Sequence, residues 1–341
     1  MARMKRTAPA IEDLEALRGP LTGYCYRMLG CAADTDDAVQ ETVIRAYRHL
    51  DRFDPARARL STWMHGIATN ICLDMLRGAQ RRALLAPVPP STPGGELGAP
   101  AAAERWLEPM PDSRTIHAAD PADLAVQRDS VRLAFLAALQ YLPPRQRAVL
   151  LLRDVYAFSA QETAQALEIT LAAANSALQR ARSTLARRRL TPSDVAASDD
   201  HQVLLDRYIA AFEAHDVTAM RDLLHSDVVA SMPPFEWWLS GRDDLAAVFA
   251  ASDACATDRL LPLRVNGTVG FGQYRPATDG ALHPFAIVAL EVRDRLVAHT
   301  ITFLGTGTRF SEFGLAQTLP CTDEFARRRA YQERNVSTSS G

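Results

Sequence analysis

Apolar residues recur at helical spacing in the first 84 residues of the chain. Ile67, Ile71 and Met75 fall on one face of a helix, which predicts that this face lies in a core. The same pattern predicts helices over Leu14–Leu29, Thr35–Asp51 and Ser61–Arg82, with a short helix before the first of them. We expect Ser61 to cap the third helix, and arginines to gather in its last turn. Residues 12–84 are therefore predicted to form an all-α domain.

A second helical block covers residues 123–190. Its pattern predicts a short helix over Gln161–Leu167, a turn over Glu168–Thr170 and a longer, increasingly basic helix over Leu171–Arg189. A short helix, a turn and a second helix are typical of a helix-turn-helix, whose second helix lies in the major groove of DNA. Residues 85–122 separate the two blocks. Their stretch Pro87–Pro111 is rich in proline, glycine and alanine, which predicts an extended, mobile linker that buries little surface.

The last third of the chain has a different pattern. An amphipathic helix with Leu204, Tyr208 and Phe212 on one side is followed by a second helix around Val217–Leu224. Four strands are then predicted, the last two joined by a tight turn at Asp294. They cover Leu263–Val269, Phe271–Arg275, Phe285–Arg293 and Leu296–Leu304. Helices followed by an antiparallel sheet predict an α+β domain over 201–320, after a short linker over 191–200 and before a polar tail over 321–341.

Composition narrows the possible classes of protein. The 341 residues are 48% hydrophobic with a net charge of −2, enough for several ordinary domain cores. No apolar run reaches about 18 residues and the start of the chain lacks a signal-peptide core, so we expect a cytoplasmic protein. The five cysteines are scattered without a CxxC pair, so we predict no metal site and no disulfide framework. Residues 124–190 carry +6, whereas 191–341 carry −7, so a polyanion is a candidate partner of the helical part.

Two motifs in series resemble a known family. DDAVQETVIRAYRHLDRFDPARARLSTWMHGIATNICLDMLR resembles region 2 of extracytoplasmic-function sigma factors. LPPRQRAVLLLRDVYAFSAQETAQAL followed by SALQRARSTL resembles their region 4. The match covers roughly 12–84 and 123–190, in the family's order. A free-standing helix-turn-helix regulator would account for the second block and leave the first without a role.

The resemblance implies that the predicted third helix of the first block meets the promoter −10 element, where DNA is melted. Trp63 would stack at the duplex boundary and Asn70 would bond a base edge, while arginines neutralise phosphates. The alternative for Trp63 is a place in the core. The candidate −10 residues are Arg57, Arg59, Ser61, Trp63, Asn70, Arg77, Arg81 and Arg82. His65 is expected to face solvent.

The preceding helix carries alternating charge along one side, with Val39, Val43 and Tyr47 able to face inward. In sigma factors, the corresponding helix docks on the clamp helices of the RNA polymerase largest subunit, so the resemblance implies the same contact here. Solvated surface is the alternative interpretation of such charges. The candidate polymerase-binding residues are Asp36, Asp37, Gln40, Glu41, Arg45 and Arg48.

The predicted recognition helix departs from the family pattern. Many relatives have a glycine in the turn and a lysine and an arginine early in the second helix, where this chain has Glu168 and LAAANSALQRAR. Asparagine and glutamine suit adenine, and arginine suits guanine or phosphate. The candidate −35 residues are Asn175, Ser176, Gln179, Arg180 and Arg182. With little early positive charge, binding at the −35 element is expected to depend on polymerase as the scaffold.

The last third resembles the cone-shaped SnoaL-like domains, through AFEAHDV, SMPPFEWWLSGRDDL, VNGTVGFGQYR and ITFLGTGTRFSEFGL. That superfamily includes enzymes, and a cone can hold a small molecule. Candidate pocket residues are Tyr208, Trp237, Trp238, Tyr274 and His299. Glu291 and His299 are on neighbouring predicted strands, but no spacing identifies an acid/base pair. Regulation, ligand sensing and catalysis therefore remain as roles for this domain.

We interpret the chain as a three-domain sigma factor that binds core RNA polymerase and promoter DNA, with the acidic third domain regulating the other two by intramolecular contact. We assign no catalytic residue, cofactor, metal or membrane partner. The rival interpretation is a SnoaL-like enzyme or small-molecule-binding protein fused to DNA-binding helices. Promoter-specific transcription with purified core polymerase would favour the first, and turnover of a ligand without polymerase the second.

Overall fold

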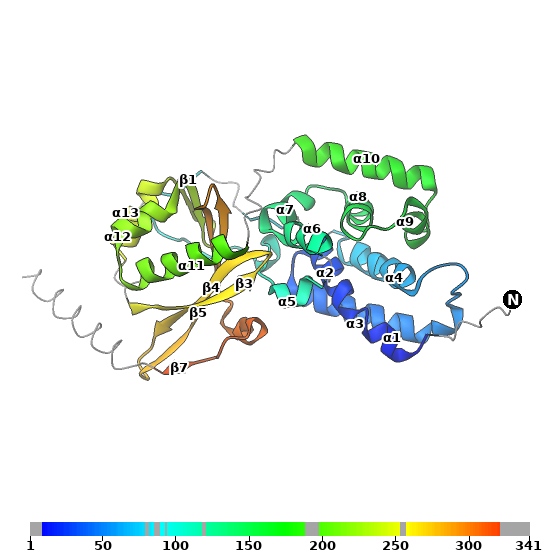
Figure 1. The fold of residues 1–341 in the computed structure, drawn as a ribbon, viewed down its shortest axis with the longest axis horizontal. Helices are drawn as coiled ribbons and strands as arrows, with labels where there is room; N and C mark the ends of the chain where they lie inside the picture. The colour runs from blue at the N-terminus through cyan, green and yellow to red at the C-terminus, as the bar shows by residue number, and fades with distance from the viewer. Residues whose placement is uncertain are drawn as a thin grey trace, which may run out of the picture. The chain divides into compact units, whose positions relative to one another are not determined.

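The computed structural model describes residues 9–78, 82–84, 89–92, 94–117, 121–187, 198–252 and 257–320, which fall into two compact units (Figure 1). The helical unit is drawn from Met1–Leu84 and Ala103–Thr191, and the sheet unit from Leu85–Ala102 and Pro192–Gly341. Helices make up the first unit, whereas helices and one mixed sheet make up the second. This confirms the predicted fold class, although the two helical domains form a single compact unit.

The first domain of the helical unit contains the predicted helices and a short one before them. They are α1 (Ile11–Glu15), α2 (Arg18–Leu29), α3 (Ala32–Arg48), the 3₁₀ turn η1 (Leu50–Arg52) and α4 (Leu60–Met75). Val39 and Val43 of α3 are buried as predicted, but Tyr47 is 60% exposed. The prediction that Tyr47 faces inward was therefore wrong.

Helix α4 is shorter than its sequence suggests. Arg59 is at its N-cap, so Ser61 lies in the first turn and is not the cap. The helix ends at Met75, shortly before Gly78, whose φ of +76° breaks the helical path. The arginines that follow are therefore not in the last turn of α4, contrary to the prediction.

Half of the predicted linker is part of the helical unit. Trp106, Leu107 and Met110 are at most 4% exposed, and the Tyr26 hydroxyl donates to the Glu108 carbonyl oxygen (2.6 Å). The turn η2 (Ala103–Arg105) and helix α5 (Asp112–Thr115) lie in the same stretch. The prediction that this stretch buries little surface was wrong for its second half, where Trp106, Leu107 and Met110 are buried, whereas Leu97 in the first half is 39% exposed.

The second helical domain follows. Its elements are α6 (Pro121–Val131), α7 (Leu133–Leu139), α8 (Pro144–Leu150), the π-helical turn η3 (Leu151–Val155), α9 (Ala160–Ala166) and α10 (Leu171–Arg187). Ser159 and Glu162 form a capping box at the start of α9. Leu167 ends α9, and Glu168 takes a left-handed conformation with φ of +53°. The predicted helix, turn and helix are thus confirmed within the described residues.

The sheet unit begins with two helices, as predicted. Its elements are α11 (Ser198–Glu213), α12 (Val217–Leu223), β1 (Leu224–Ser231), β2 (Trp238–Ser240), α13 (Arg242–Ala250), β3 (Arg259–Val265), β4 (Thr268–Pro276), β5 (Ala281–Arg293), β6 (Leu296–Leu304), the 3₁₀ turn η5 (Gly307–Phe313) and β7 (Leu319–Pro320). The strand order is β2-β1-β6-β5-β4-β3, with β7 beside β5. Only β1 and β6 pair in parallel among the described strands, so the sheet is mixed and not fully antiparallel as predicted.

One face of this sheet is covered by helices (Figure 1). Tyr208 and Phe212 of α11 are buried in a cluster that also holds Phe271 of β4 and Phe249 of α13. The predicted strand Leu263–Val269 is instead two strands, because Asn266 and Gly267 both have positive φ and form a hairpin turn. The predicted turn at Asp294 is confirmed. Residues 191–197 and the tail over 321–341 lie outside the described residues.

The other half of the predicted linker is held by the sheet unit. The Ser91 amide donates to the Trp238 carbonyl oxygen (2.7 Å), and the Ala101 amide donates to the Pro234 carbonyl oxygen (2.8 Å). Pro100 also bridges to Phe235. The stretch from Ser91 to Ala101 is thus fixed at one end to β2 and at the other end to the loop that precedes β2.

Candidate nucleic-acid interface

The candidate −10 residues of α4 lie on its outer face. Trp63 is half-buried and its ring packs against Phe53, with centroids 5.3 Å apart. Asn70 lies further along the same helix and is exposed, as are Arg57, Arg59 and Arg77. A flat apolar ring beside an amide and several cations can stack on a base and contact phosphates.

A crevice of about 140 Å³ separates this face of α4 from the helix-turn-helix. Trp63 and Asn70 line one wall, and Gln165 and Glu168 line the other. Arg59 and Glu162 form an ion pair between the same two domains. In this arrangement the face of α4 that carries Trp63 and Asn70 is turned towards α9, with the crevice between them.

Arg82 has other partners than DNA. Its guanidinium donates to the Asp34 carboxylate (2.7 Å) and to the Trp106 carbonyl oxygen (3.1 Å), and its side chain is only 11% exposed. These contacts fasten the segment after α4 to the start of α3 and already balance the charge of Arg82. Arg81, another of the candidate −10 residues, lies outside the described residues.

His65 is buried, which corrects the expectation that it faces solvent. It is 2% exposed and packs against the rings of Tyr24, Tyr156 and Phe158. Burial lowers the pKa of His65 to about 4, so the imidazole is neutral at pH 7. His65 is therefore a core residue between the two helical domains.

The candidate −35 residues occupy the exposed side of α10. Asn175, Ser176, Gln179 and Arg180 are exposed. Arg182 makes a two-pronged ion pair with Asp154 (2.6 and 3.0 Å), so its charge is already partly balanced. The four other side chains are available to a DNA groove.

The charged side of α3 faces outward, as the sequence predicts. Glu41 pairs with Arg45 (2.6 Å), and the remaining candidate polymerase-binding residues are exposed. A groove of about 880 Å³ runs beside this side, with Ile11 of α1 and Tyr47 of α3 exposed along it. Tyr47, which the helical pattern placed inward, and Ile11, which no pattern singled out, are thus both exposed beside these charges.

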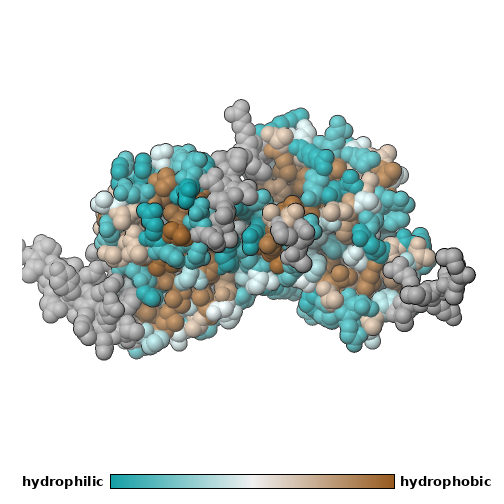
Figure 2. Space-filling view, viewed as in Figure 1, coloured by the Kyte–Doolittle hydropathy of each residue, from teal (hydrophilic) through white to brown (hydrophobic). Residues whose placement is uncertain are grey.

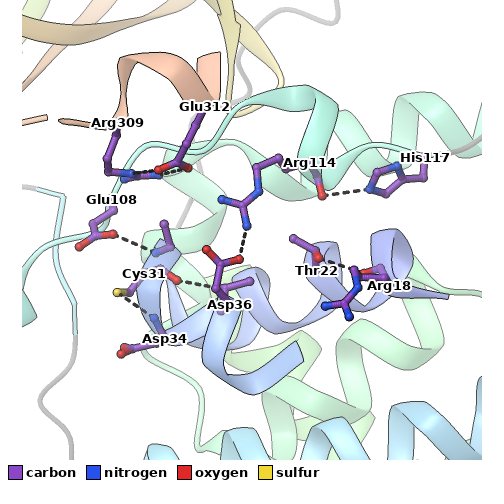
Figure 3. A network of polar contacts seen from close by, with 12 residues as sticks. Arg18, Thr22, Cys31, Asp34, Asp36, Glu108, Arg114, His117, Arg309 and Glu312 are labelled. Atoms are coloured by element: carbon purple, nitrogen blue, oxygen red, sulfur yellow. Dashed lines mark hydrogen bonds and ion pairs between the residues drawn. The ribbon is translucent and has the colours of Figure 1, made fainter. Parts of the chain in front are cut away.

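The segment after η2 reaches the same side of α3 (Figure 3). Arg114 forms an ion pair with Asp36 and lines the groove, and the Glu108 carboxylate accepts the Ala32 amide (2.9 Å) at the start of α3. The candidate docking surface is therefore built from α1, α3 and a part of the predicted linker.

The candidate pocket residues of the sheet unit do not form one cluster. Tyr208 stacks on Phe271, whereas Tyr274 packs edge-on against Phe310 and its hydroxyl donates to the Ala316 carbonyl oxygen (2.7 Å). Trp237 belongs to a separate apolar cluster with Leu239. Trp238 is half-buried on β2.

His299 and Glu291 are directly opposite each other on β6 and β5. His299 Nε2 lies 3.0 Å from Ser231 Oγ, and desolvation lowers the pKa of His299 to about 4. A neutral imidazole bonded to a hydroxyl can stabilise the sheet without any chemistry. No group of three or more potential metal ligands occurs among the residues that the structure describes.

Figure 2 shows polar residues interspersed with smaller apolar patches on the visible face of each unit. In the described part of the chain, no helix combines the length and the apolar character that a membrane span requires.

Three family models match the chain in the order of its domains. They are Sigma-70 region 2 over residues 14–82, Sigma-70 region 4 over 132–185 and the SnoaL-like domain over 205–299.

Curated relatives and a solved structure match as well. The chain is 41% identical to ECF RNA polymerase sigma factor SigG of Mycobacterium tuberculosis over 317 residues, covering 89% of this chain and 83% of that protein. It is 30% identical over 220 residues to SigJ of the same organism, covering 64% of this chain and 63% of SigJ. The crystal structure of SigJ shares the fold, with a TM-score of 0.58, 24% identity, and coverage of 90% of this chain and 100% of that one. The chain therefore belongs to the extracytoplasmic-function family of RNA polymerase sigma factors, with a C-terminal SnoaL-like domain.

Proposed function

We infer that this sigma factor binds core RNA polymerase and promoter DNA and directs transcription initiation. We propose that the exposed side of α3 docks on the clamp helices of the polymerase largest subunit. The observation that carries this proposal is the surface made by that side and its groove, where charged residues flank the exposed Ile11 and Tyr47. Exposed apolar side chains surrounded by charge are typical of interfaces that must also be stable in water.

Reversing charge on this side should weaken docking. In Asp37→Lys/Glu41→Lys, the new lysines would face the positive charges of polymerase that the original carboxylates attract. Like charges across an interface lower the affinity for the partner and slow association. We expect at least about a tenfold loss of affinity for core polymerase, or about 1.4 kcal/mol, measured by competition against a second sigma factor at low salt. Asp51→Lys/Glu104→Lys is the matched control, since both residues are exposed and the net charge changes equally. Equal competition by the two variants would contradict the docking surface.

We propose further that Trp63 and Asn70 hold melted DNA at the −10 element, with Arg57, Arg59 and Arg77 on phosphates. The half-buried ring of Trp63 supports this role, since one of its sides packs on Phe53 while the residue also lines an open crevice. Asn175, Ser176, Gln179 and Arg180 of α10 would contact the −35 element.

The loss of the Trp63 ring should impair promoter melting. A base that stacks on an aromatic side chain contributes about 1–3 kcal/mol, so Trp63→Ala should reduce open-complex formation roughly five- to a hundredfold. Permanganate footprinting of thymines around −10 measures this step. Polymerase binding should be unchanged, and a pre-melted template should recover part of the loss. A wild-type footprint in the variant would assign Trp63 to packing alone.

The C-terminal domain is proposed to regulate the other two in cis. It has a net charge opposite in sign to that of the region 4 block, and it holds the linker through Pro234 and Trp238. The SnoaL-like fold is shared with enzymes, but the dispersed candidate pocket residues give no observation that favours catalysis here.

A further inference from the structure

The two helical domains cannot contact both promoter elements in the arrangement seen here. Helix α4, with the candidate −10 residues, lies against α9 of the helix-turn-helix. The two elements are named for positions −10 and −35, so their centres are about 25 base pairs apart, or roughly 85 Å at about 3.4 Å per pair. The domains must therefore separate before both elements are bound, and what holds them together decides how readily they do so.

Two buried arginines lie at the interface between the two helical domains, which we call the seam. Each comes from one domain and donates hydrogen bonds to the other. Arg27 of α2 is fully buried, and its guanidinium donates to Ser130 Oγ (2.9 Å), the Gln127 carbonyl oxygen (3.0 Å) and the Tyr156 hydroxyl (3.1 Å) of the second domain. Arg147 of α8 is 3% exposed and donates back to the carbonyl oxygen of Met28, the residue next to Arg27.

Neither guanidinium has a carboxylate partner among the described residues. Desolvation lowers the pKa of both groups, to about 10 for Arg147, while only tyrosine and cysteine side chains favour their charged forms. Burial of a cation among neutral acceptors costs several kcal/mol, which hydration returns when the seam opens. An apolar seam would return nothing on opening, because it would expose only hydrophobic surface.

We propose that Arg27 and Arg147 form a polar latch that keeps the seam between the two helical domains reversible. The two guanidinium groups hold the domains together through hydrogen bonds across the seam. When the seam opens, water hydrates the guanidinium groups, and this hydration free energy offsets part of the free energy of the contacts that are lost. The role of opening in transcription rests on the proposed function, but the latch itself is a property of the free protein.

Removal of the charge should tighten the seam. In Arg27→Met, the groups that accept hydrogen bonds from Arg27 keep other partners. The Ser130 hydroxyl still donates to the Gln127 carbonyl oxygen (2.9 Å), and the Tyr156 hydroxyl still donates to the Pro20 carbonyl oxygen (3.3 Å). Buried ionic groups replaced by apolar residues of similar volume often leave a fold equally or more stable. Arg27→Lys keeps the charge but loses the fork, so it should open the seam.

The test measures the separation of the domains in the full-length protein without polymerase or DNA. Spin labels at Ala56→Cys and Ser183→Cys, both exposed positions, report the distance between the domains by pulsed electron paramagnetic resonance. Cys255 and Cys321 are replaced by serine, since the other three cysteines are buried. Urea at concentrations below unfolding populates the open form in the wild type. Near-ultraviolet circular dichroism confirms that each variant is folded.

Arg27→Met should lower the ratio of open to closed protein about tenfold, or about 1.4 kcal/mol, and Arg27→Lys should raise it several-fold. Arg147→Met is an independent second variant expected to act like Arg27→Met. Arg145→Met, on the same helix but exposed, should change nothing. An open population that rises in both methionine variants, or that stays equal to the Arg145→Met control, would overturn the latch.

Transcription provides the link to function. If opening is required for promoter contact, Arg27→Met should also reduce initiation, and mild urea should restore part of it. If the Asp37→Lys/Glu41→Lys variant docks normally, the proposed docking surface fails, whereas the distances between the spin labels still decide the latch.

Discussion

Gly66→Leu should hold the two helical domains apart in the free protein. A Cβ atom at Gly66 would lie 2.7 Å from the carbonyl oxygen of Ala166, which is backbone and cannot swing aside. Overpacking of this kind costs about 1–3 kcal/mol, which corresponds to a roughly five- to a hundredfold shift towards the open form. Leucine also favours helix over glycine by up to about 1 kcal/mol, so α4 itself should remain folded.

Small-angle X-ray scattering of the full chain checks this prediction as a rise in the radius of gyration, with helical content unchanged by circular dichroism. Asp74→Leu is the matched control, because it adds the same side chain to an exposed position of the same helix. If Gly66→Leu were as compact as the control, the space between α4 and α9 would accommodate the leucine, and the close contact with the Ala166 carbonyl oxygen would not force the domains apart.

Helix periodicity predicted most elements that bury one face. Val39, Val43, Leu204, Tyr208 and Phe212 are all buried as the 3.6-residue pattern indicates. The turn before α10 was located as well, although glutamate replaces the glycine that many relatives have there. Glu168 tolerates φ of +53° at a cost of about 1 kcal/mol, which local sequence signals do not reveal.

Contacts between residues far apart in the chain escaped prediction. From its neighbours in sequence, Arg82 is predicted to be another cation of an arginine-rich helix end. Its hydrogen-bond acceptors, Asp34 and Trp106, are distant in sequence and gave no local signal. Arg27 gave no signal at all, since its acceptors lie about 100 residues later. Composition also misled, because a linker poor in large apolar residues can still bury several of them, as it does Trp106, Leu107 and Met110.

Alternation along β4 explains part of the dispersal of the candidate pocket residues. Tyr274 is three positions after Phe271, so it lies on the opposite face of the strand, against Phe310 and away from the cluster that holds Phe271 and Tyr208. The resemblance grouped these residues by the shape of the domain and not by the face of the sheet on which each one lies. The adjacency of Glu291 and His299, by contrast, was predicted correctly because the hairpin turn that joins their strands was recognised.

A chain that ends at Arg189 should differ several-fold from the full-length protein in promoter-specific transcription while still binding core polymerase. Residues 191–341 carry −7 and residues 124–190 carry +6, so their contact is electrostatically favoured, and the covalent connection keeps their local concentration high. Truncation also removes Pro234 and Trp238, whose carbonyl oxygens accept the amides of Ala101 and Ser91. The linker between the two DNA-contacting domains would then lose both of its anchors.

Salt separates these two contributions. Exposed charges are screened over about 8–10 Å at physiological ionic strength, so the charge-dependent part of the difference should shrink as salt is raised. The part that depends on the linker anchors should persist, because short backbone hydrogen bonds are less sensitive to salt. Full-length Ser91→Pro/Ala101→Pro, which lacks both amide donors, should reproduce that salt-resistant part, with Glu96→Pro as the control at an exposed linker position. If the truncated chain matched the full-length protein at every salt concentration, regulation in cis would be wrong and ligand sensing or catalysis by the SnoaL-like domain would become the better interpretation.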